Sequence, residues 1–426
     1  MKLTKRLNQK IKILLLSGFL LLSLKSTGQS LEACRNWALE NSAAWSQQKL
    51  QHEIGQLNKE QIKSQLLPQL LINGSASYQS EVFTLPFQIP GTDTPVIPKD
   101  QYNLSLNIQQ TLYDGKATHR QQALATAESQ LKTAQIGLKD DHLAQIIHEL
   151  YFGILQLEAQ LNIQEVLLDE LDNRLKTARI SEKQGLVLSS QIKQLEKERL
   201  KVIQNQTALT LKNQSLRTSL SNWTGQSLME AQLTIPALNE SLSTTINRQE
   251  LEVFQQQQAL VNLKSELTNS QRSPKLFAFG NLGLGQPNPL NFFETDWNGY
   301  YMVGAKLQWQ LWDWGKTNKE RESLSLQYQS ITLEQDHFLQ QIAQQQELII
   351  SEIRQLESQL TIDAQLVSLQ EDILQSATMQ LEEGTISHTD YLTELNQLAQ
   401  LKTHQVNHEI QLAYQKINYL TLIGQL

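Results

Sequence analysis

Two stretches of this sequence, YNLSLNIQQTLYDGK at residues 102–116 and YMVGAKLQWQLWDWGK at residues 301–316, share one pattern. In both, apolar residues alternate with polar or small residues, which places the two kinds of side chain on opposite faces of a strand. Each stretch then passes through an Asp-Gly or Asp-Trp-Gly turn into a long helical pattern. A strand with one apolar and one polar face is typical of a membrane-spanning β-barrel.

Each of these strands has an alternating partner upstream. We expect strands at about residues 69–80 and 101–113 in the first half of the chain, and at about residues 275–285 and 300–313 in the second. Both pairs enclose a loop that contains prolines. Strands of about ten residues suit a tilted crossing of a bilayer, so the pattern predicts two membrane hairpins. The glycines of residues 280–285 lack the order of a dinucleotide-binding loop, and we interpret them as keeping the barrel wall thin.

Long helices follow the hairpins. Residues 117–184 contain no proline, and their apolar residues recur at alternating spacings of three and four, which predicts a coiled-coil helix on the order of 100 Å long. Gly185 ends that helix, and a return helix covers about residues 189–220. The second half repeats this arrangement, with helices at 317–383 and 388–422 on either side of Gly384.

The two halves are related by a constant offset of 199 residues, which separates Asp114 from Asp313 and Gly185 from Gly384. We therefore predict two tandem structural repeats of helix, β-hairpin, long helix, turn and helix. The first repeat covers residues 29–222 and the second covers residues 244–426. Residues 223–243 form a connector in the equatorial region between them.

The first 28 residues have the pattern of a signal peptide. A basic segment precedes an apolar run at residues 13–24, and Ser26 and Gly28 are the small residues of a cleavage site. The apolar run is too short to remain as a membrane span. Cys34 lies ten residues beyond this run and follows a glutamate, so we interpret it as a helix residue and not as a lipid-modified cysteine.

Composition and motifs exclude several classes of protein. The net charge of -7 gives no reason to expect a nucleic-acid partner, and a single cysteine excludes an internal disulfide. We find no catalytic or cofactor-binding motif, and predict that the chain is not an enzyme and uses no cofactor. His404 and His408 lie four residues apart on one helical face, but no third metal ligand lies between them.

Four strands cannot close a membrane barrel, and an open sheet would leave unpaired edges in lipid. The simplest solution is a trimer whose twelve strands close one barrel. The helices are rich in Gln, Glu and Lys, so they must lie outside the bilayer. The predicted fold class is therefore a mixed α and β membrane protein, with a trimeric barrel and a coiled-coil periplasmic tunnel. The alternative is a soluble periplasmic coiled-coil scaffold or adaptor whose strands belong to a small sandwich.

The sequence resembles the TolC-like outer membrane efflux family over residues 30–426. The resemblance rests on the repeat and on four motifs: SLEACRNWALENS at 30–42, LLPQL at 66–70, the LYDGK and LWDWGK turns, and EEGTISHTDYLTELNQL at 382–398. It implies a homotrimeric exit duct in the outer membrane. Such a duct docks through a periplasmic adaptor onto an inner-membrane efflux pump or ABC transporter, and it passes drugs, metals or secreted proteins.

The resemblance also implies roles for residues at the two helix turns. The turns match the family's adaptor-docking tips, which gives as docking residues Gln184, Gly185, Leu186, Val187, Glu383, Gly384, Thr385 and Ile386. Asp390 matches a position that lines the periplasmic gate, where three copies would form a ring of carboxylates that attracts cations.

Several positions depart from the family pattern. Thr393 stands where the family has a second gate carboxylate, and Gln191 is the uncharged counterpart of Asp390 in the first repeat. Gln380 and Leu381 replace the arginine and aromatic residue that often precede the tip glycine. A second interpretation of Asp390 is that its charge only stabilises the start of the return helix.

Aromatic residues cluster where the strands meet the polar helices. This position suits an interfacial girdle of Tyr113, Trp309, Trp312 and Trp314. The alternative is that the tryptophans belong to the core of a soluble sheet.

Overall fold

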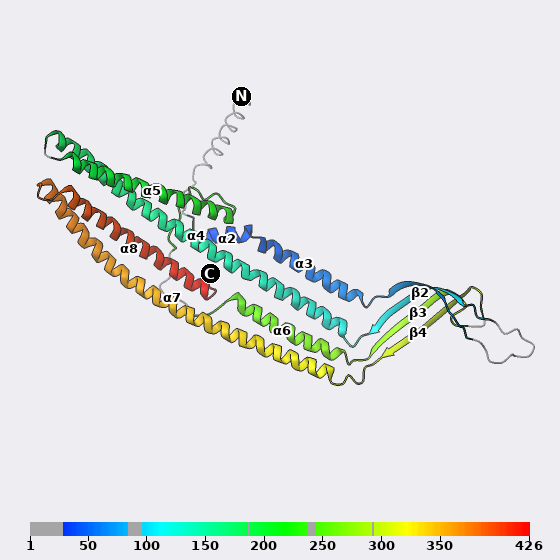
Figure 1. Cartoon of the computed structure of the whole chain (residues 1–426). Coiled ribbons are helices and arrows are strands. Elements are labelled where there is room, and N and C mark those ends of the chain that lie inside the picture. The colour runs from blue at the N-terminus through cyan, green and yellow to red at the C-terminus, as the bar shows by residue number, and fades with distance from the viewer. Residues whose placement is uncertain (1–28, 84–95, 186, 237–243, 292–293) are drawn as a thin grey trace, which may run out of the picture. The chain divides into compact units, whose positions relative to one another are not determined.

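The computed structural model describes residues 29–83, 96–185, 187–236, 244–291 and 294–426. The predicted signal peptide, residues 237–243 of the connector and the tip residue Leu186 lie outside the described residues. The chain divides into two compact units, of which one contains residues 47–136 and 250–338 and the other contains residues 137–249 and 339–426 together with the N-terminal segment up to residue 46. We call them the sheet unit and the helical unit and describe each by itself (Figure 1).

The sheet unit contains a four-stranded antiparallel meander. Its strands are β1 (Gln69–Tyr78), β2 (Asp100–Tyr113), β3 (Lys275–Gln286) and β4 (Asn298–Gln308), in the order β1-β2-β3-β4. The register places Ile72 opposite Leu106, Leu106 opposite Leu282, and Leu282 opposite Tyr301. The apolar residues of neighbouring strands therefore lie on the same face, and the two predicted hairpins form one continuous sheet.

One face of this sheet is apolar along nearly its whole extent. Its positions on the four strands are Leu70, Ile72, Gly74, Ala76, Tyr102, Leu104, Leu106, Ile108, Leu276, Ala278, Gly280, Leu282, Leu284, Gly299, Tyr301, Val303, Ala305 and Leu307. The opposite face carries mostly Asn, Ser and Gln with a few aromatic rings. This division is the one expected of strands between lipid and water.

Glycines on the polar face accommodate two aromatic rings. A Cβ atom at Gly283 would meet the ring of Tyr300 at 2.6 Å, and one at Gly304 would meet the ring of Phe279 at 2.7 Å. Each ring therefore lies against the backbone of the neighbouring strand and does not project away from the sheet. The Tyr300 hydroxyl also donates a hydrogen bond to Asn103 Oδ1 at 2.7 Å. The two glycines thus let both rings lie close to the backbone of the sheet.

The last strand is shorter than predicted. We expected it to continue to residue 313, but β4 ends at Gln308. The reason is that β3 begins at Lys275, which pairs with Gln308. Residues 309–313 therefore have no residue of β3 with which to pair. Trp309 instead donates a hydrogen bond from Nε1 to the backbone oxygen of Arg272 at 3.0 Å.

Two similar turns connect the hairpins to the long helices α4 (Ala117–Lys183) and α7 (Lys316–Glu382). Asp114 accepts a hydrogen bond from the Thr118 backbone nitrogen at 2.6 Å, and Asp313 accepts one from the Thr317 nitrogen at 3.1 Å. These carboxylates bind nitrogens that lack partners at a helix start. The Asp-Gly and Asp-Trp-Gly motifs are therefore helix caps.

The sheet unit also contains α6 (Gln249–Ser270) and most of α3 (Ala43–Ser64). The chain before the first hairpin forms two helices, α2 (Leu31–Asn41) and α3. Ser42 separates the two helices, because its hydroxyl accepts a hydrogen bond from the Trp45 nitrogen at 3.3 Å and so caps the start of α3. Gly55 of α3 packs so closely on α4 that a Cβ there would lie 2.3 Å from the Ser129 hydroxyl.

The helical unit consists of α2, the later parts of α4 and α7, α5 (Ser189–Thr224) and α8 (His388–Leu422). A first apolar cluster, which includes Cys34, Ile147, Ile154, Leu220 and Ile417, joins α2, α4, α5 and α8. Cys34 is fully buried there, and burial raises the pKa of its thiol to about 11. Cys34 thus lies in a helix, as predicted, and belongs to the core.

The connector is anchored by buried polar groups. Arg217 of α5 is buried and donates hydrogen bonds to Glu158 and to the backbone oxygens of Leu228 and Ala231. The Tyr151 hydroxyl donates to the backbone oxygen of Thr234 at 2.8 Å. The helix α5 continues to Thr224 before Gly225 ends it with a φ of 68°. The predicted repeat boundary at residue 222 therefore falls within the last helical turn.

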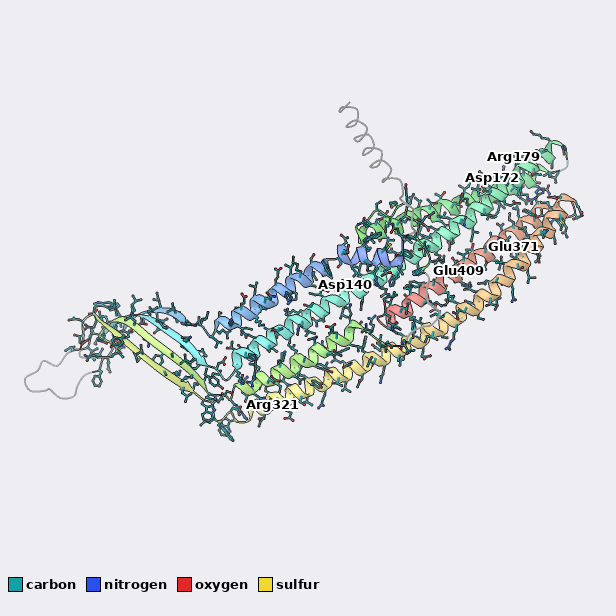
Figure 2. The ribbon with its side chains drawn as sticks, turned by 180° about the vertical axis from the view of Figure 1, so that it is seen from behind. Asp140, Asp172, Arg179, Arg321, Glu371 and Glu409 are labelled. Atoms are coloured by element: carbon teal, nitrogen blue, oxygen red, sulfur yellow. The ribbon has the colours of Figure 1, made fainter. Side chains whose placement is uncertain are left out.

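The surfaces of the helices are strongly polar. Figure 2 shows charged side chains along them, including Asp172, Arg179, Glu371 and Glu409. Many of these groups are paired across helices, as in the contact of 2.7 Å between Arg179 and Glu196. Within the described residues, we find no helix with both the length and the hydropathy needed to cross a membrane.

Candidate functional site

The predicted tips are tight turns that require glycine. Gly185 has a φ of 77° and Gly384 has a φ of 73°, a region that side chains disfavour. The Gly185 nitrogen donates to the Glu182 oxygen at 2.9 Å, and the Gly384 nitrogen donates to the Leu381 oxygen at 3.1 Å. No atom lies within 4 Å of a Cβ built at either glycine. The backbone conformation alone therefore requires glycine at both positions, and both glycines remain accessible.

The other predicted docking residues divide into two groups. Gln184, Glu383 and Thr385 are exposed, whereas Val187 and Ile386 are half-buried against the apolar cluster below the turns. Thr385 also closes its own turn, because its backbone nitrogen and its hydroxyl each donate to the Gln380 oxygen at 2.9 Å. The exposed group can contact a partner, and the half-buried pair supports the turns.

Asp390 begins α8 as part of a capping box. Its carboxylate accepts hydrogen bonds from the Ser387 nitrogen at 3.0 Å and from the Ser387 hydroxyl at 2.7 Å, and its own nitrogen donates to that hydroxyl at 3.2 Å. The bonds from Ser387 hold the pKa of the carboxyl below its usual value. These hydrogen bonds show that Asp390 caps α8. Asp390 is also exposed, so its negative charge can still act on ions in the surrounding water.

Gln191 occupies the equivalent position in the first repeat. Its side-chain oxygen accepts a hydrogen bond from the Leu188 nitrogen at 3.3 Å. In both α5 and α8, therefore, a side-chain oxygen binds the backbone nitrogen three residues earlier. Thr393 is exposed on α8 and donates its hydroxyl proton to the Thr389 oxygen at 3.0 Å. It supplies no charge, as the sequence predicted.

Two further carboxylates near Asp390 escaped the sequence analysis. Asp372 of α7 and Glu394 of α8 line the same surface hollow of about 370 Å³ as Asp390. Glu394 accepts a hydrogen bond from the Gln370 amide at 2.7 Å. The spacing of four residues between Asp390 and Glu394, which places them on one helical face, was the available signal.

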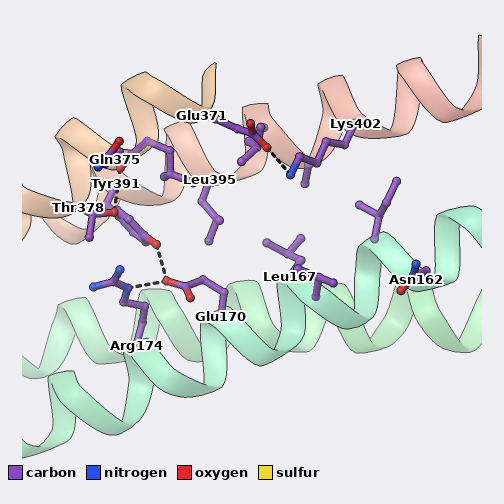
Figure 3. A pocket seen from close by; sticks show the side chains of 15 residues that line it. Asn162, Leu167, Glu170, Arg174, Glu371, Gln375, Thr378, Tyr391, Leu395 and Lys402 are labelled. Carbon is purple, nitrogen blue, oxygen red and sulfur yellow. Dashed lines mark hydrogen bonds and ion pairs between the residues drawn. The ribbon is translucent and has the colours of Figure 1, made fainter. Parts of the chain in front are cut away.

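A polar contact between α4 and α8 was also missed. The Tyr391 hydroxyl donates to Glu170 Oε1 at 2.6 Å, and Arg174 Nε donates to the same oxygen at 2.7 Å (Figure 3). The Arg174 guanidinium lies 4.7 Å from the centre of the Tyr391 ring. Burial raises the pKa of Tyr391 to about 12, so its hydroxyl keeps its proton at neutral pH. We call these three residues the α4–α8 link.

The link lies at one end of a cavity of about 610 Å³ that α4, α7 and α8 enclose. Leu167 and Leu395 belong to its apolar wall, and the ion pair of Glu371 with Lys402, at 2.7 Å, lies on its rim. The spacing of four between Glu170 and Arg174 was visible in the sequence, but it also fits an ordinary surface pair within one helix. Their contact with Tyr391, 221 residues along the chain from Glu170, could not be read from that spacing.

The predicted girdle residues are all exposed in the chain. The exposed fractions are 48% for Tyr113, 57% for Trp309, 72% for Trp312 and 85% for Trp314. A bulge at the end of β2 pairs Tyr113 with Leu276 and so places it on the apolar face. None of the four contributes to a core of this chain, in contrast to the alternative interpretation.

His404 and His408 do not form a metal centre with a third ligand in the described part of the chain. Their rings are 6.4 Å apart, and His408 Nδ1 lies 2.6 Å from Asp363 Oδ2. His408 therefore contributes to a contact between α7 and α8.

Comparison with known proteins identifies the fold. No protein-family model and no curated protein sequence matches the chain. Among solved structures, the chain is similar to the outer membrane protein VceC from Vibrio cholerae, with a TM-score of 0.67, 16% identity and coverage of 92% of this chain and 96% of that one. It is also similar to the Campylobacter jejuni CmeC outer membrane channel, with a TM-score of 0.67, 12% identity and coverage of 93% and 85%.

A third similar structure is the open state of the Neisseria gonorrhoeae MtrE outer membrane channel. Its TM-score is 0.66, its identity is 14%, and the match covers 92% of this chain and 88% of that one. Sequence identities this low establish the fold alone. The fold is that of these TolC-like channels, which confirms the resemblance read from the sequence at that level.

Proposed function

We propose that this chain is one protomer of a homotrimeric outer membrane duct, which conducts substrates from a periplasmic adaptor and an inner-membrane efflux pump or ABC transporter to the outside. The observation that carries the proposal is the exposed apolar face of the sheet. Ile72, Leu282 and Val303 on this face are 71%, 60% and 76% exposed. Burial of a leucine or valine side chain is worth about 1.5–3 kcal/mol, so a surface of this kind needs lipid or another apolar partner.

The two edges of the sheet support a ring of copies. In the meander, β1 and β4 are both edge strands and have no further strand beside them among the described residues. If β4 of one copy pairs with β1 of the next, the contact is head-to-tail and closes into a ring. Three copies give twelve strands, and closure removes the edges that lipid does not tolerate.

The alternative of a soluble periplasmic scaffold requires a second layer over the apolar face. The described residues provide no such layer, because the residues of that face are exposed on β1 and β4 and are exposed or half-buried on β2 and β3. The similar structures CmeC and MtrE are outer membrane channels, which favours the same choice.

We further propose that the helix turns form the periplasmic end of the duct. The exposed residues Gln184, Glu383 and Thr385 would contact the adaptor, and three copies of Asp390 would form the gate ring. A wide aqueous duct has few convergent contacts, and we expect it to perform no chemistry. Its substrates would be drugs, metals or secreted proteins.

The proposal is tested by extracting the full chain from outer membranes in detergent, measuring its mass, and recording currents in planar bilayers. We expect a trimer that gives small, cation-selective currents, and we expect Asp390→Ala to increase them. Asp390→Asn is the matched variant, because it keeps an oxygen that can cap α8 and removes only the charge. A monomer that stays in solution without detergent and gives no current would rule the duct out.

A further inference from the structure

The polar face of the sheet carries two lysines and no carboxylate. Lys275 begins β3 opposite Gln308, and Lys306 of β4 lies opposite Phe277. Both therefore share the face of Asn281 and Asn103, and they are diagonal neighbours about 7–8 Å apart. Every other polar-face position of the four strands is uncharged.

Nothing near the lysines neutralises them in the part of the chain that the structure describes. The carboxylate closest to Lys306 along the sequence has another partner, since Asp313 is bound to Arg272 at 2.8 Å. Its counterpart in the first repeat, Asp114, caps α4. The edge strand β1, with the sequence QLLINGSASY, has no charged residue at all. A neighbouring copy that paired β1 with β4 would thus bring no counter-charge on its strand. The net charge of the chain is -7, so this cationic face is opposite in sign to the molecule as a whole.

We propose that Lys275 and Lys306 make the barrel end of the duct selective for anions, in opposition to the cation-attracting ring of Asp390 at the closed gate, and that the open duct favours substrates that carry carboxylate, sulfate or phosphate groups. The inference rests on the proposed function, because the polar face becomes an interior only when copies close the barrel. Three copies then place six ammonium groups around the end of the barrel at which β4 leads to α7. The rings of Tyr300 and Phe279 lie flat over glycines, so the longer lysine side chains extend furthest into the water.

The expected size of the effect follows from Coulomb's law. In water, one ammonium group about 10 Å from an ion changes the local concentration of that ion by about twofold, and 0.1 M salt screens the effect over a similar distance. After screening, six such groups together change the chloride concentration by about fivefold. The effect should therefore fall steeply as the salt concentration rises.

The test is the reversal potential of the trimer in a planar bilayer under a KCl gradient. We expect Lys275→Gln/Lys306→Gln to lower the ratio of chloride to potassium permeability about 25-fold, because the potential that raises chloride about fivefold lowers potassium by the same factor. The matched control Lys275→Arg/Lys306→Arg keeps both charges and should keep the ratio. Both doubles are best compared in the Asp390→Asn background, which removes the opposing charge of the proposed gate.

A second variant locates the charge. Cys34 is buried, so Lys306→Cys adds an accessible thiol that water-soluble reagents can modify. A cationic thiol reagent should restore anion preference, and an anionic reagent should reverse it. Channels whose selectivity is the same in the glutamine double and in wild type would overturn the inference and leave the duct intact. Absence of any channel would overturn the proposed function itself.

Discussion

Removal of the Tyr391 hydroxyl tests whether the α4–α8 link holds the duct closed. Tyr391→Phe keeps the ring and its contact with Arg174 and deletes only the hydrogen bond to Glu170, which is 2.6 Å long. A hydrogen bond to a charged group contributes about 1.5–3 kcal/mol when buried. The Glu170 side chain is 34% exposed, so we take a lower value of about 1 kcal/mol.

That energy sets the expected change in opening. If α8 must part from α4 when the duct opens, a loss of about 1 kcal/mol raises the ratio of open to closed protomers about fivefold. If three protomers open together, the ratio for the trimer rises on the order of a hundredfold. Glu170→Gln should act in the same direction, because it removes the charge that strengthens the bond and leaves Arg174 without its partner.

The assay is single-channel recording at neutral pH, with the open fraction as the readout. Tyr414→Phe is the matched control: Tyr414 is also on α8, and its ring contact with Phe152, at 5.3 Å, survives the change. An intact Tyr391→Phe trimer with the open fraction of wild type would refute the reasoning. An equal increase in the Tyr414→Phe control would show that any loss of a hydroxyl on α8 has this effect.

Three further predictions concern stability. Gly384→Ala should lower the free energy of unfolding by about 1–2 kcal/mol through its positive φ alone, since a Cβ there meets no atom; chemical denaturation checks this, and an unchanged value would contradict it. Arg217→Met should lower the free energy of unfolding by about 3 kcal/mol, because it leaves Glu158 and two backbone oxygens without their hydrogen-bond donor. In the control, Arg179→Met at the exposed pair with Glu196 should lower it by less than about 1 kcal/mol. Equal losses in chemical denaturation would be evidence against the anchoring role. Arg272 and Thr317 hold the pKa of Asp313 below its unfolded value near 3.8, so its contribution is present above that pH and is lost as the pH falls through the folded value. Asp313→Asn should therefore lower the melting temperature at pH 7, and its effect should become smaller as the pH falls below 3.8. An equal effect at neutral and at acid pH would count against the cap.

The repeat pattern was the most informative part of the sequence. Alternation of period two gave the strands to within a few residues, because the face of each side chain is fixed by its position along a strand. The long helices were equally predictable, since the turn glycines at 185 and 384 mark their ends. Prediction failed where a partner decides the outcome, as at the end of β4, which depends on where β3 begins.

The candidate site was only partly readable, for a similar reason. Asp390 could be assigned to a helix start from its distance to Gly384, which is a local property. The contact of Tyr391 with Glu170 joins helices more than 200 residues apart, and no local spacing encodes it. The bulge that turns Tyr113 to the apolar face was equally hidden, because simple alternation assigns that residue to the polar face.

The two repeats share their backbone more closely than their chemistry. At the turns into α4 and α7, consecutive residues have positive φ in both copies, yet the first uses Gly115 and Lys116 whereas the second uses Trp314 and Gly315. The second copy also places a charge where the first has an amide, with Asp390 in place of Gln191 and Lys306 in place of Asn107. In a threefold assembly each such residue would occur three times and alternate with a neutral counterpart. We infer that geometry is specified by both repeats, whereas the charge that an ion would meet along the proposed duct is specified mainly by the second.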